Sequence, residues 1–270
     1  MNPEYRIAKA AVRSLGEGRP SIHDVSGHAP SLNLILFTAD EAARPLPLAD
    51  PRARHLLKTL RRRPGDTFDA GLVNGPRGRG RIESADGATL RVSFEWGEAP
   101  APRPPLVLLV GLPRPQTARD ILRDATTLGV AEMHFVLTEK GDPAYARSSL
   151  WTGEEWRRLL IAGAQQAFDT RLPAVTHGRT LADVLAALPS GSTRLALDNY
   201  EAAAPLAECH VIRDTSAVLV IGPERGWSSA DRTLLRGAGF TLVHLGPRVL
   251  RTETAVIAAV TLLKARLGWA

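Results

Sequence analysis

The sequence contains one cysteine, Cys209, and no pair of histidines at the spacing of metal ligands. A single cysteine cannot form an intrachain disulfide or supply a four-thiolate zinc site. We therefore predict a protein without a metal site and without a disulfide framework.

Long hydrophobic runs are also absent. A membrane-spanning helix needs roughly 20 mostly apolar residues, whereas the longest candidate, residues 106–112, is only long enough for a strand. Residues 1–20 are charged and lack the apolar centre of a secretory signal. We therefore expect a cytoplasmic protein that does not bind membranes.

Two common catalytic motifs are missing as well. The glycines between Gly75 and Gly80 lack the lysine–serine ending of a P-loop, and no Gly-x-Ser-x-Gly segment marks a serine hydrolase. The sequence therefore favours neither of these enzyme classes.

Lysine is scarce, because only four of the 34 basic residues are lysines. The arginines contribute to a formal net charge of +6, and their planar side chains match the geometry of phosphate groups. Between residues 52 and 63 the basic residues are Arg52, Arg54, Lys58, Arg61, Arg62 and Arg63, with no acid among them. This basic run predicts a face that binds nucleic-acid phosphates, and a merely solvated surface is the alternative.

Composition divides the chain into four parts. Residues 1–30 have little hydrophobic periodicity and are predicted to be a poorly ordered extension. Residues 31–98 carry short strand-like runs and turns, which predicts a small β domain. Residues 99–105 are rich in proline and form the predicted linker to a second domain over residues 106–270.

Within the β domain we expect one helix, over residues 50–63, with Asp50 as its N-cap and Pro51 in its first position. The predicted strands of this domain are 32–38, 67–73, 80–84 and 89–95.

In the second domain strand-like and helical segments alternate, which predicts an α/β fold with a parallel sheet covered by helices. The predicted strands are 106–111, 132–137, 194–198, 217–221 and 241–245. The predicted helices are 116–128, 154–168, 181–188, 230–237 and 253–267.

The strand at 217–221 leads into a loop with the sequence IGPERGWS, residues 221–228. Ligands of open α/β sheets bind beside such strand ends. Gly222 and Gly226 would let the backbone approach a flat ligand such as adenine. Ser228 and Asp231 have the spacing of a capping box, so a helix is expected to start there. An ordinary strand–turn–helix connection is the alternative explanation.

A second loop, LGPRVLRTET over residues 245–254, follows the next predicted strand. It places two arginines, two threonines and a glutamate directly before an apolar helix. Thr252 or Glu253 could serve only as a helix cap, but a second Gly-Pro turn in the same region favours a ligand site. A third polar group, Gln166, Asp169, Thr170 and Arg171, lies at a helix end, and we expect it to be solvated.

The two loops together resemble the signature pair of the SPOUT methyltransferases, and more closely that of the RsmE family, which methylates N3 of a uridine in 16S ribosomal RNA. The second loop is the more specific signal, because it carries Leu-Gly-x-Arg-x-Leu-Arg-x-Glu-Thr-Ala at the family's distance from Gly-Pro-Glu-x-Gly. Residues 53–68, 121–130 and 164–175 are similar to further family segments. The resemblance covers the chain from about residue 32 onward.

The resemblance implies a PUA-like N-terminal β-barrel, a SPOUT domain with a C-terminal trefoil knot, and a homodimer. It implies S-adenosylmethionine (SAM) as the cofactor and 16S rRNA or the small ribosomal subunit as the partner. The implied cofactor-binding residues are Leu197, Ile221, Gly222, Gly226, Leu245, Gly246, Leu250, Thr252 and Thr254.

The resemblance also implies the chemistry. A methyl sulfonium is a strong electrophile, so the enzyme must chiefly align it with the acceptor. Arg251 is expected to stabilise negative charge that develops on the uracil oxygens. Glu224 or Glu253 is expected to accept the N3 proton or to orient the base, and Arg248 to hold RNA phosphate together with the basic run.

Three residues depart from the family pattern. Arg225 replaces the second glycine of the first loop, Gln165 stands in place of a glutamate, and Gln116 in place of a basic residue. Arg225 could block a close backbone approach or add an RNA contact. The alternatives are therefore a SPOUT methyltransferase with another RNA or non-RNA acceptor, and a non-catalytic knotted RNA-binding paralogue.

Overall fold

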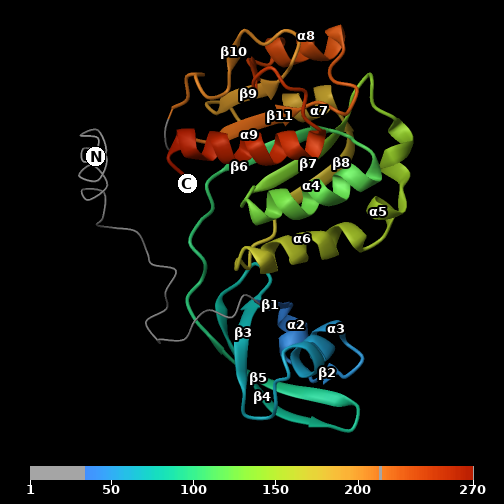
Figure 1. The fold of residues 1–270 in the computed structure, drawn as a ribbon, viewed down its shortest axis with the longest axis vertical. Helices are drawn as coiled ribbons and strands as arrows, with labels where there is room; N and C mark the ends of the chain where they lie inside the picture. The colour runs from blue at the N-terminus through green and yellow to red at the C-terminus, as the bar shows by residue number, and fades with distance from the viewer. Residues whose placement is uncertain (1–33, 213–214, 270) are drawn as a thin grey trace, which may run out of the picture. The chain divides into compact units, whose positions relative to one another are not determined.

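The computed structural model describes residues 34–212 and 215–269, so the predicted extension over residues 1–30 lies outside the described residues. Two sheets organise the described chain (Figure 1). In these two ranges no helix is long and apolar enough to cross a membrane. Nor do three or more His, Cys, Asp or Glu side chains come together there in a way that could hold a metal ion.

The first sheet has five strands in the order β1-β3-β4-β5-β2, with β1 and β3 parallel and the other neighbours antiparallel. Its core includes Phe37, Phe68 and Leu90. The strands are β1 (Ile35–Phe37), β2 (Leu46–Pro47), β3 (Thr67–Leu72), β4 (Arg77–Asp86) and β5 (Thr89–Trp96). The four predicted strands are confirmed, whereas β2 and the short helix α2 (Ala39–Ala42) were not predicted.

Strand β4 begins three residues earlier than its hydrophobic pattern indicates. Its first residues pair with strands on both sides, Arg77 with Gly71 of β3 and Gly78 with Trp96 of β5, and the packing at its glycines is close. A Cβ on Gly78 would lie 2.0 Å from the Glu95 carbonyl oxygen, and one on Gly80 would lie 2.4 Å from the Phe68 ring. The segment over residues 77–80, in which arginine and glycine alternate, is therefore part of β4, although it has no apolar side chains.

The helix predicted over residues 50–63 is only partly correct. Asp50 caps helix α3 (Pro51–Arg54), and its carboxylate accepts the Arg52 N–H at 2.8 Å. A single π-helical turn over His55–Thr59 follows. Arg61 then has φ 54°, so the helix ends before residue 63. Pro64 also disfavours a helical conformation at Arg63, the last residue of the predicted helix.

The second sheet has seven strands in the order β10-β12-β9-β11-β6-β7-β8, and every neighbouring pair is parallel. This confirms the predicted α/β fold. The strands are β6 (Leu106–Gly111), β7 (Glu132–Leu137), β8 (Ala174–Thr180), β9 (Thr193–Leu197), β10 (Ala204–Pro205), β11 (Ala217–Ile221) and β12 (Thr241–His244). The helices are α4 (Pro115–Thr127), α5 (Ser149–Thr152), α6 (Glu155–Gln166), α7 (Leu181–Ala186), α8 (Ser229–Gly237) and α9 (Thr252–Leu267).

Helices cover both faces of this sheet, and the central strands are apolar on both sides. Leu108 packs with residues of α4 and α9 in one core cluster, while its neighbour Leu109 packs with residues of α7 and α8 in another. Helices α4, α6 and α9 lie on the same side of the sheet (Figure 1). Each fully buried leucine of this kind stabilises the fold by roughly 1.5–3 kcal/mol.

The prediction that the polar group after α6 is solvated is wrong for three of its members, since Arg171 is only partly exposed and pairs with Asp169 at 3.5 Å. Thr170 is fully buried, and its hydroxyl donates to the Gly75 carbonyl oxygen at 2.5 Å. Asp169 forms an ion pair with Arg103 at 2.9 Å. Tertiary contacts far along the chain explain the error, since nothing in the local sequence shows them.

Candidate active site

A cavity of about 660 Å³ lies at the carboxyl ends of β9, β11 and β12. Its wall includes Leu197 and Ile221, the last residues of β9 and β11, and Leu245, which follows β12. Strands β6, β7 and β8 follow one another toward one edge of the sheet. The next strand in sequence, β9, lies in the opposite direction, on the far side of β11, so the strand order reverses here. Ligands of open α/β sheets bind at such a reversal of strand order. The volume falls in the range of roughly 300–1,000 Å³ that is typical of small-molecule sites.

The loop after β11 forms one part of the wall. Trp227 is buried, and its indole N–H donates to the Leu197 carbonyl oxygen at 2.8 Å, which ties the loop to the end of β9. A Cβ on Gly222 would lie 3.3 Å from the Trp227 ring, and Gly226 has φ 66°. The backbone of this loop therefore depends on both glycines.

Helix α8 begins as the sequence predicts. The Ser228 hydroxyl accepts the Asp231 N–H at 3.0 Å, and the Asp231 carboxylate accepts the Ser228 N–H at 3.1 Å. This capping box fixes the point at which the loop ends.

A buried ion pair supports the loop after β9. Arg232 Nε donates to the Asp198 carboxylate, which in turn accepts the N–H groups of Tyr200 at 2.6 Å and Glu201 at 3.1 Å. The Arg232 guanidinium also lies 5.7 Å from the centroid of the Tyr200 ring. Burial raises the pKa of Asp198, but these hydrogen bonds outweigh it and hold the pKa below its ordinary value.

The loop between β12 and α9 forms the opposite wall. Gly246 has φ 102°, and its N–H donates to His244 Nδ1 at 3.0 Å. Arg251 is the N-cap residue of α9 but caps it without a side-chain hydrogen bond. Thr252 and Glu253 lie in the first turn and line the cavity, so neither is the N-cap.

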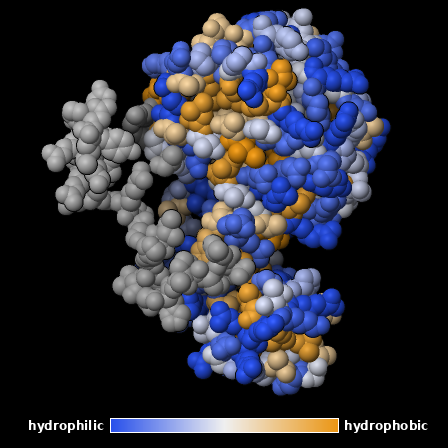
Figure 2. Space-filling model, viewed as in Figure 1, coloured by the Kyte–Doolittle hydropathy of each residue, from blue (hydrophilic) through white to orange (hydrophobic). Residues whose placement is uncertain are grey.

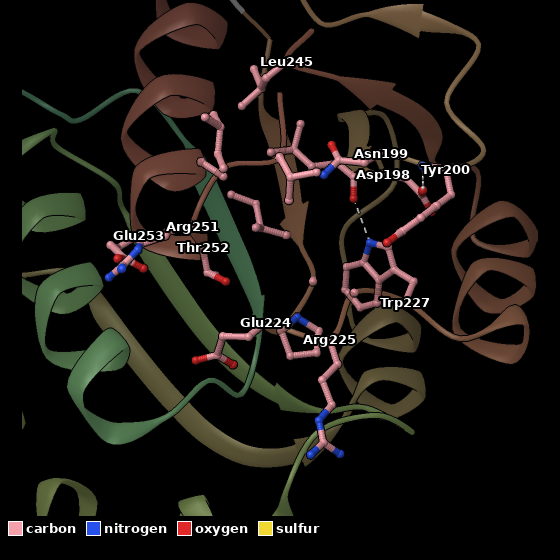
Figure 3. Close-up of a pocket in the computed structure, with 18 of the residues that line it drawn as sticks. Asp198, Asn199, Tyr200, Glu224, Arg225, Trp227, Leu245, Arg251, Thr252 and Glu253 are labelled. Carbon is pink, nitrogen blue, oxygen red and sulfur yellow. Dashed lines mark hydrogen bonds between the residues drawn. The ribbon is translucent and has the colours of Figure 1, made fainter. Parts of the chain in front are cut away.

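All three candidate catalytic residues line the same cavity. Figure 3 shows Arg251 and Glu253 on one side of it and Trp227 and Tyr200 on the other. The Glu224 carboxylate accepts the backbone N–H of Arg114 at 3.0 Å, which links the loop after β11 to the loop after β6. A guanidinium and two carboxylates thus face one space.

Most of the predicted cofactor-binding residues also line this cavity. Those in the wall are Leu197, Ile221, Gly222, Gly226, Leu245, Leu250 and Thr252, whereas Gly246 and Thr254 are not in it. Arg248 lines it as well, and neither Gln116 nor Gln165 does. The side chain of Arg225 extends away from Trp227 and Tyr200 (Figure 3). This direction favours an added RNA contact over a block of the backbone approach.

Comparisons with known proteins agree with this geometry. The family model of the RNA methyltransferase domain matches residues 100–264. The chain is 36% identical to the ribosomal RNA small subunit methyltransferase E of Treponema pallidum, over 84% of this chain and 89% of that protein. It is 28% identical to the methyltransferase E 1 of Borreliella burgdorferi, over 87% and 99%.

The chain belongs to the RsmE family of RNA methyltransferases.

Solved structures show the same fold. A probable rRNA methyltransferase from Porphyromonas gingivalis superposes with a TM-score of 0.72 at 24% identity, covering 86% of this chain and 98% of that one. The methyltransferase E of Neisseria gonorrhoeae, bound to SAM, superposes with a TM-score of 0.70 at 21% identity, covering 86% and 97%. The family inferred from the two loops is thus confirmed.

The basic run of this RsmE-family chain is not uniform. Arg52 forms ion pairs with Glu41 and Asp50, both at 2.8 Å, and its hydrogen bonds lower the pKa of each carboxyl. Glu41 lies eleven residues before Arg52, outside the run, so this pairing was not predictable from the sequence. No ion pair within the described residues involves the other five cations. The contacts of Arg52 favour a structural role, and RNA binding by the run stays a prediction.

Sequence reasoning missed several wall residues of this family member. They are Arg114, Thr117, Asp198, Asn199, Tyr200, Trp227, Arg232, Val249 and Ala255. Tyr200 is 81% exposed. An aspartate directly after a buried strand, with an aromatic residue two positions later, was the available signal for the Asp198–Tyr200 segment.

Proposed function

We propose that this chain transfers the methyl group of SAM to N3 of a uridine in the 16S rRNA of the small ribosomal subunit, in the cytoplasm. One observation carries the proposal: Arg251, Glu253 and Glu224 face one cavity at the carboxyl ends of β9, β11 and β12. The names of the relatives support the choice of RNA.

The residues of the cavity fit SAM. Leu197, Ile221 and Leu250 supply an apolar surface for a flat base, and the backbone at Gly222 leaves room that a Cβ would take. The N-terminal end of helix α9 also lies in the wall. Its partial positive charge favours a negatively charged group such as the carboxylate of SAM. SAM, when bound, supplies an electrophilic methyl group.

The described side chains supply the rest of the chemistry. The Arg251 guanidinium hydrogen bonds to uracil oxygens and stabilises the negative charge that they gain as N3 loses its proton. Glu224 or Glu253 accepts that proton or orients the imide, because both carboxylates face the same space.

The domain organisation is part of the proposal. Residues 31–98 form a PUA-like β-barrel domain that docks on the rRNA through the basic run, residues 99–105 are the linker, and residues 106–270 form the SPOUT domain with a trefoil knot at its C-terminal end. Phosphate contacts of this kind position a protein on RNA without reading its sequence. They are supplied by the five basic residues that make no ion pair with another described residue: Arg54, Lys58, Arg61, Arg62 and Arg63.

A homodimer through α9 is the proposed assembly. Hydrophobic residues gather on the face of the molecule where α9 lies (Figures 1 and 2). Ile257 on this helix is 40% exposed, and Val249 in the loop before it is 81% exposed. Large apolar side chains exposed next to a binding site are typical of an interface.

Two measurements test the function. Calorimetry with SAM should show binding to the folded protein, and absence of binding would reject an enzyme and leave a non-catalytic RNA-binding protein. Mass mapping of rRNA nucleosides from a deletion strain should show the loss of 3-methyluridine and its return with the wild-type gene. Unchanged 3-methyluridine in the deletion strain would reject the assignment of the acceptor.

A further inference from the structure

A second cavity, of about 280 Å³, lies beside the first. The two cavities share Arg114, Glu224 and Arg225 in their walls, whereas Lys140 and Tyr145 line only the second. Three segments meet here: the loop after β6, the loop after β7 and the loop after β11. Nothing in the proposed reaction uses this space.

The cations of the second cavity are available to a ligand. Arg114, Lys140 and Arg225 are all exposed. None of them takes part in an ion pair in the described parts of the chain. Three positive charges at the mouth of one small cavity favour an anion.

The two acids of the wall, Glu224 and Asp142, offset only part of this charge. The Glu224 carboxylate accepts the Arg114 backbone N–H at 3.0 Å, and the Asp142 carboxylate accepts the Ala144 N–H at 2.9 Å. Both carboxylates are therefore bonded to backbone groups. The wall keeps an excess of one positive charge, from three cations and two acids.

The position of the cavity identifies the anion. The acceptor base must enter the first cavity beside Arg251 and Glu224, and Glu224 also belongs to the second cavity. A backbone phosphate next to that base can therefore reach the second cavity. Arginine side chains match phosphate oxygens in a forked geometry, and lysine adds a point charge.

We propose that the second cavity is a phosphate subsite, in which Arg114, Lys140 and Arg225 bind a backbone phosphate next to the target uridine. The inference rests on the proposed function and deepens it. A base that leaves its stack costs a few kcal/mol, and a phosphate held beside the site offsets part of this cost by fixing the backbone. The subsite also gives a role to Arg225, the cation that replaces a glycine of the family loop.

Lys140 offers the sharpest test, because it lines the second cavity and not the first. The substrate is small ribosomal subunits from a strain that lacks the gene, and the variants are Lys140→Ala, Lys140→Arg and Arg225→Ala. Arg157→Ala is the matched control, since Arg157 is exposed on α6 and lines neither cavity. The measurements are kcat and KM for the subunits at several salt concentrations, Kd for SAM, and thermal unfolding.

We expect Lys140→Ala to raise KM for the subunits roughly fivefold, as the loss of one phosphate contact should. The slope of log(kcat/KM) against log salt should become shallower by about 0.7–1. Kd for SAM and Tm should stay unchanged, Lys140→Arg should restore KM, and Arg225→Ala should behave like Lys140→Ala. Arg157→Ala should leave KM and the slope at wild-type values.

Three results would overturn the subsite. One is an unchanged KM and salt slope in Lys140→Ala. Another is an equal rise of KM in Arg157→Ala, which would show that the effect comes from the net charge of the protein and not from this cavity. The third is a several-fold rise of Kd for SAM in Lys140→Ala, which would assign the cavity to the cofactor. A wild-type protein that fails to methylate the subunits would instead reject the proposed function and the subsite with it.

Discussion

Asp198 and Arg232 form an ion pair inside the protein, with side chains that are only 1% and 9% exposed. The aspartate follows β9 directly, and the arginine lies on α8. Because the same carboxylate accepts the N–H groups of Tyr200 and Glu201, the pair fixes the loop that places Tyr200 beside the first cavity. A contact between two elements thus shapes the site without taking part in the chemistry.

Replacement of Arg232 by methionine should destabilise the protein and weaken SAM binding. The substitution leaves a buried carboxylate without its cation, and such a loss costs about 3–5 kcal/mol. A looser Tyr200 loop should also raise Kd for SAM several-fold, which calorimetry would detect. The free energy of unfolding in urea gives the stability change.

Arg236→Met is the matched control for this prediction. Arg236 lies on the same helix and pairs with Glu201 at 2.6 Å, but its side chain is 50% exposed. Surface pairs contribute only about 0–1 kcal/mol, so this variant should stay close to wild type. Equal effects of the two substitutions would contradict a special role of the buried pair.

The lowered pKa of Asp198 predicts a stability change in acid. A carboxyl whose pKa is lower in the folded state stabilises that state above its ordinary pKa, near 3.8, and loses this contribution as pH falls through the folded value. The difference in unfolding free energy between wild type and Asp198→Asn should therefore be constant near neutral pH. It should shrink as the pH falls below about 4, and a difference that does not change with falling pH would contradict the prediction.

Arg251→Ala should lower kcat at least about tenfold, which corresponds to about 1.4 kcal/mol of transition-state stabilisation. The physical reason is the loss of the charge that balances the uracil oxygens during transfer. Folding should be unaffected, because Arg251 is exposed and makes no ion pair with another described residue. Undiminished turnover with normal SAM binding would remove Arg251 from the mechanism.

The sequence predicted three central strands to the residue, β6, β7 and β11. Strands β6 and β11 are uninterrupted apolar runs, as strands buried on both faces are, whereas β7 also contains Glu132 and His134. Strand β8 escaped prediction because it lies at the sheet edge and is largely exposed, so its residues carry no apolar pattern. The short β10 lies at the opposite edge and was missed as well.

The candidate site was predictable where its residues follow one another in the chain. Two short loops contain most of the wall, and their spacing was enough to indicate the family. Pairs that form only through folding were not predictable, such as Asp198 with Arg232 and Arg52 with Glu41. A knot is a property of the chain path, which hydrophobic periodicity does not encode, so it stays a prediction.

Gly222 gives a direct test of the proposed cofactor site. A methyl group at this position would lie 3.3 Å from the Trp227 ring and 3.4 Å from the Gly226 backbone. The loop would have to shift to make room for it, and this shift would change the shape of the cavity. We expect Gly222→Ala to raise Kd for SAM at least about tenfold, or about 1.4 kcal/mol. Gly237→Ala is the control, because a Cβ there meets nothing within 4 Å and lies at the end of α8. If the two variants bind SAM equally well, the loop after β11 does not hold the cofactor.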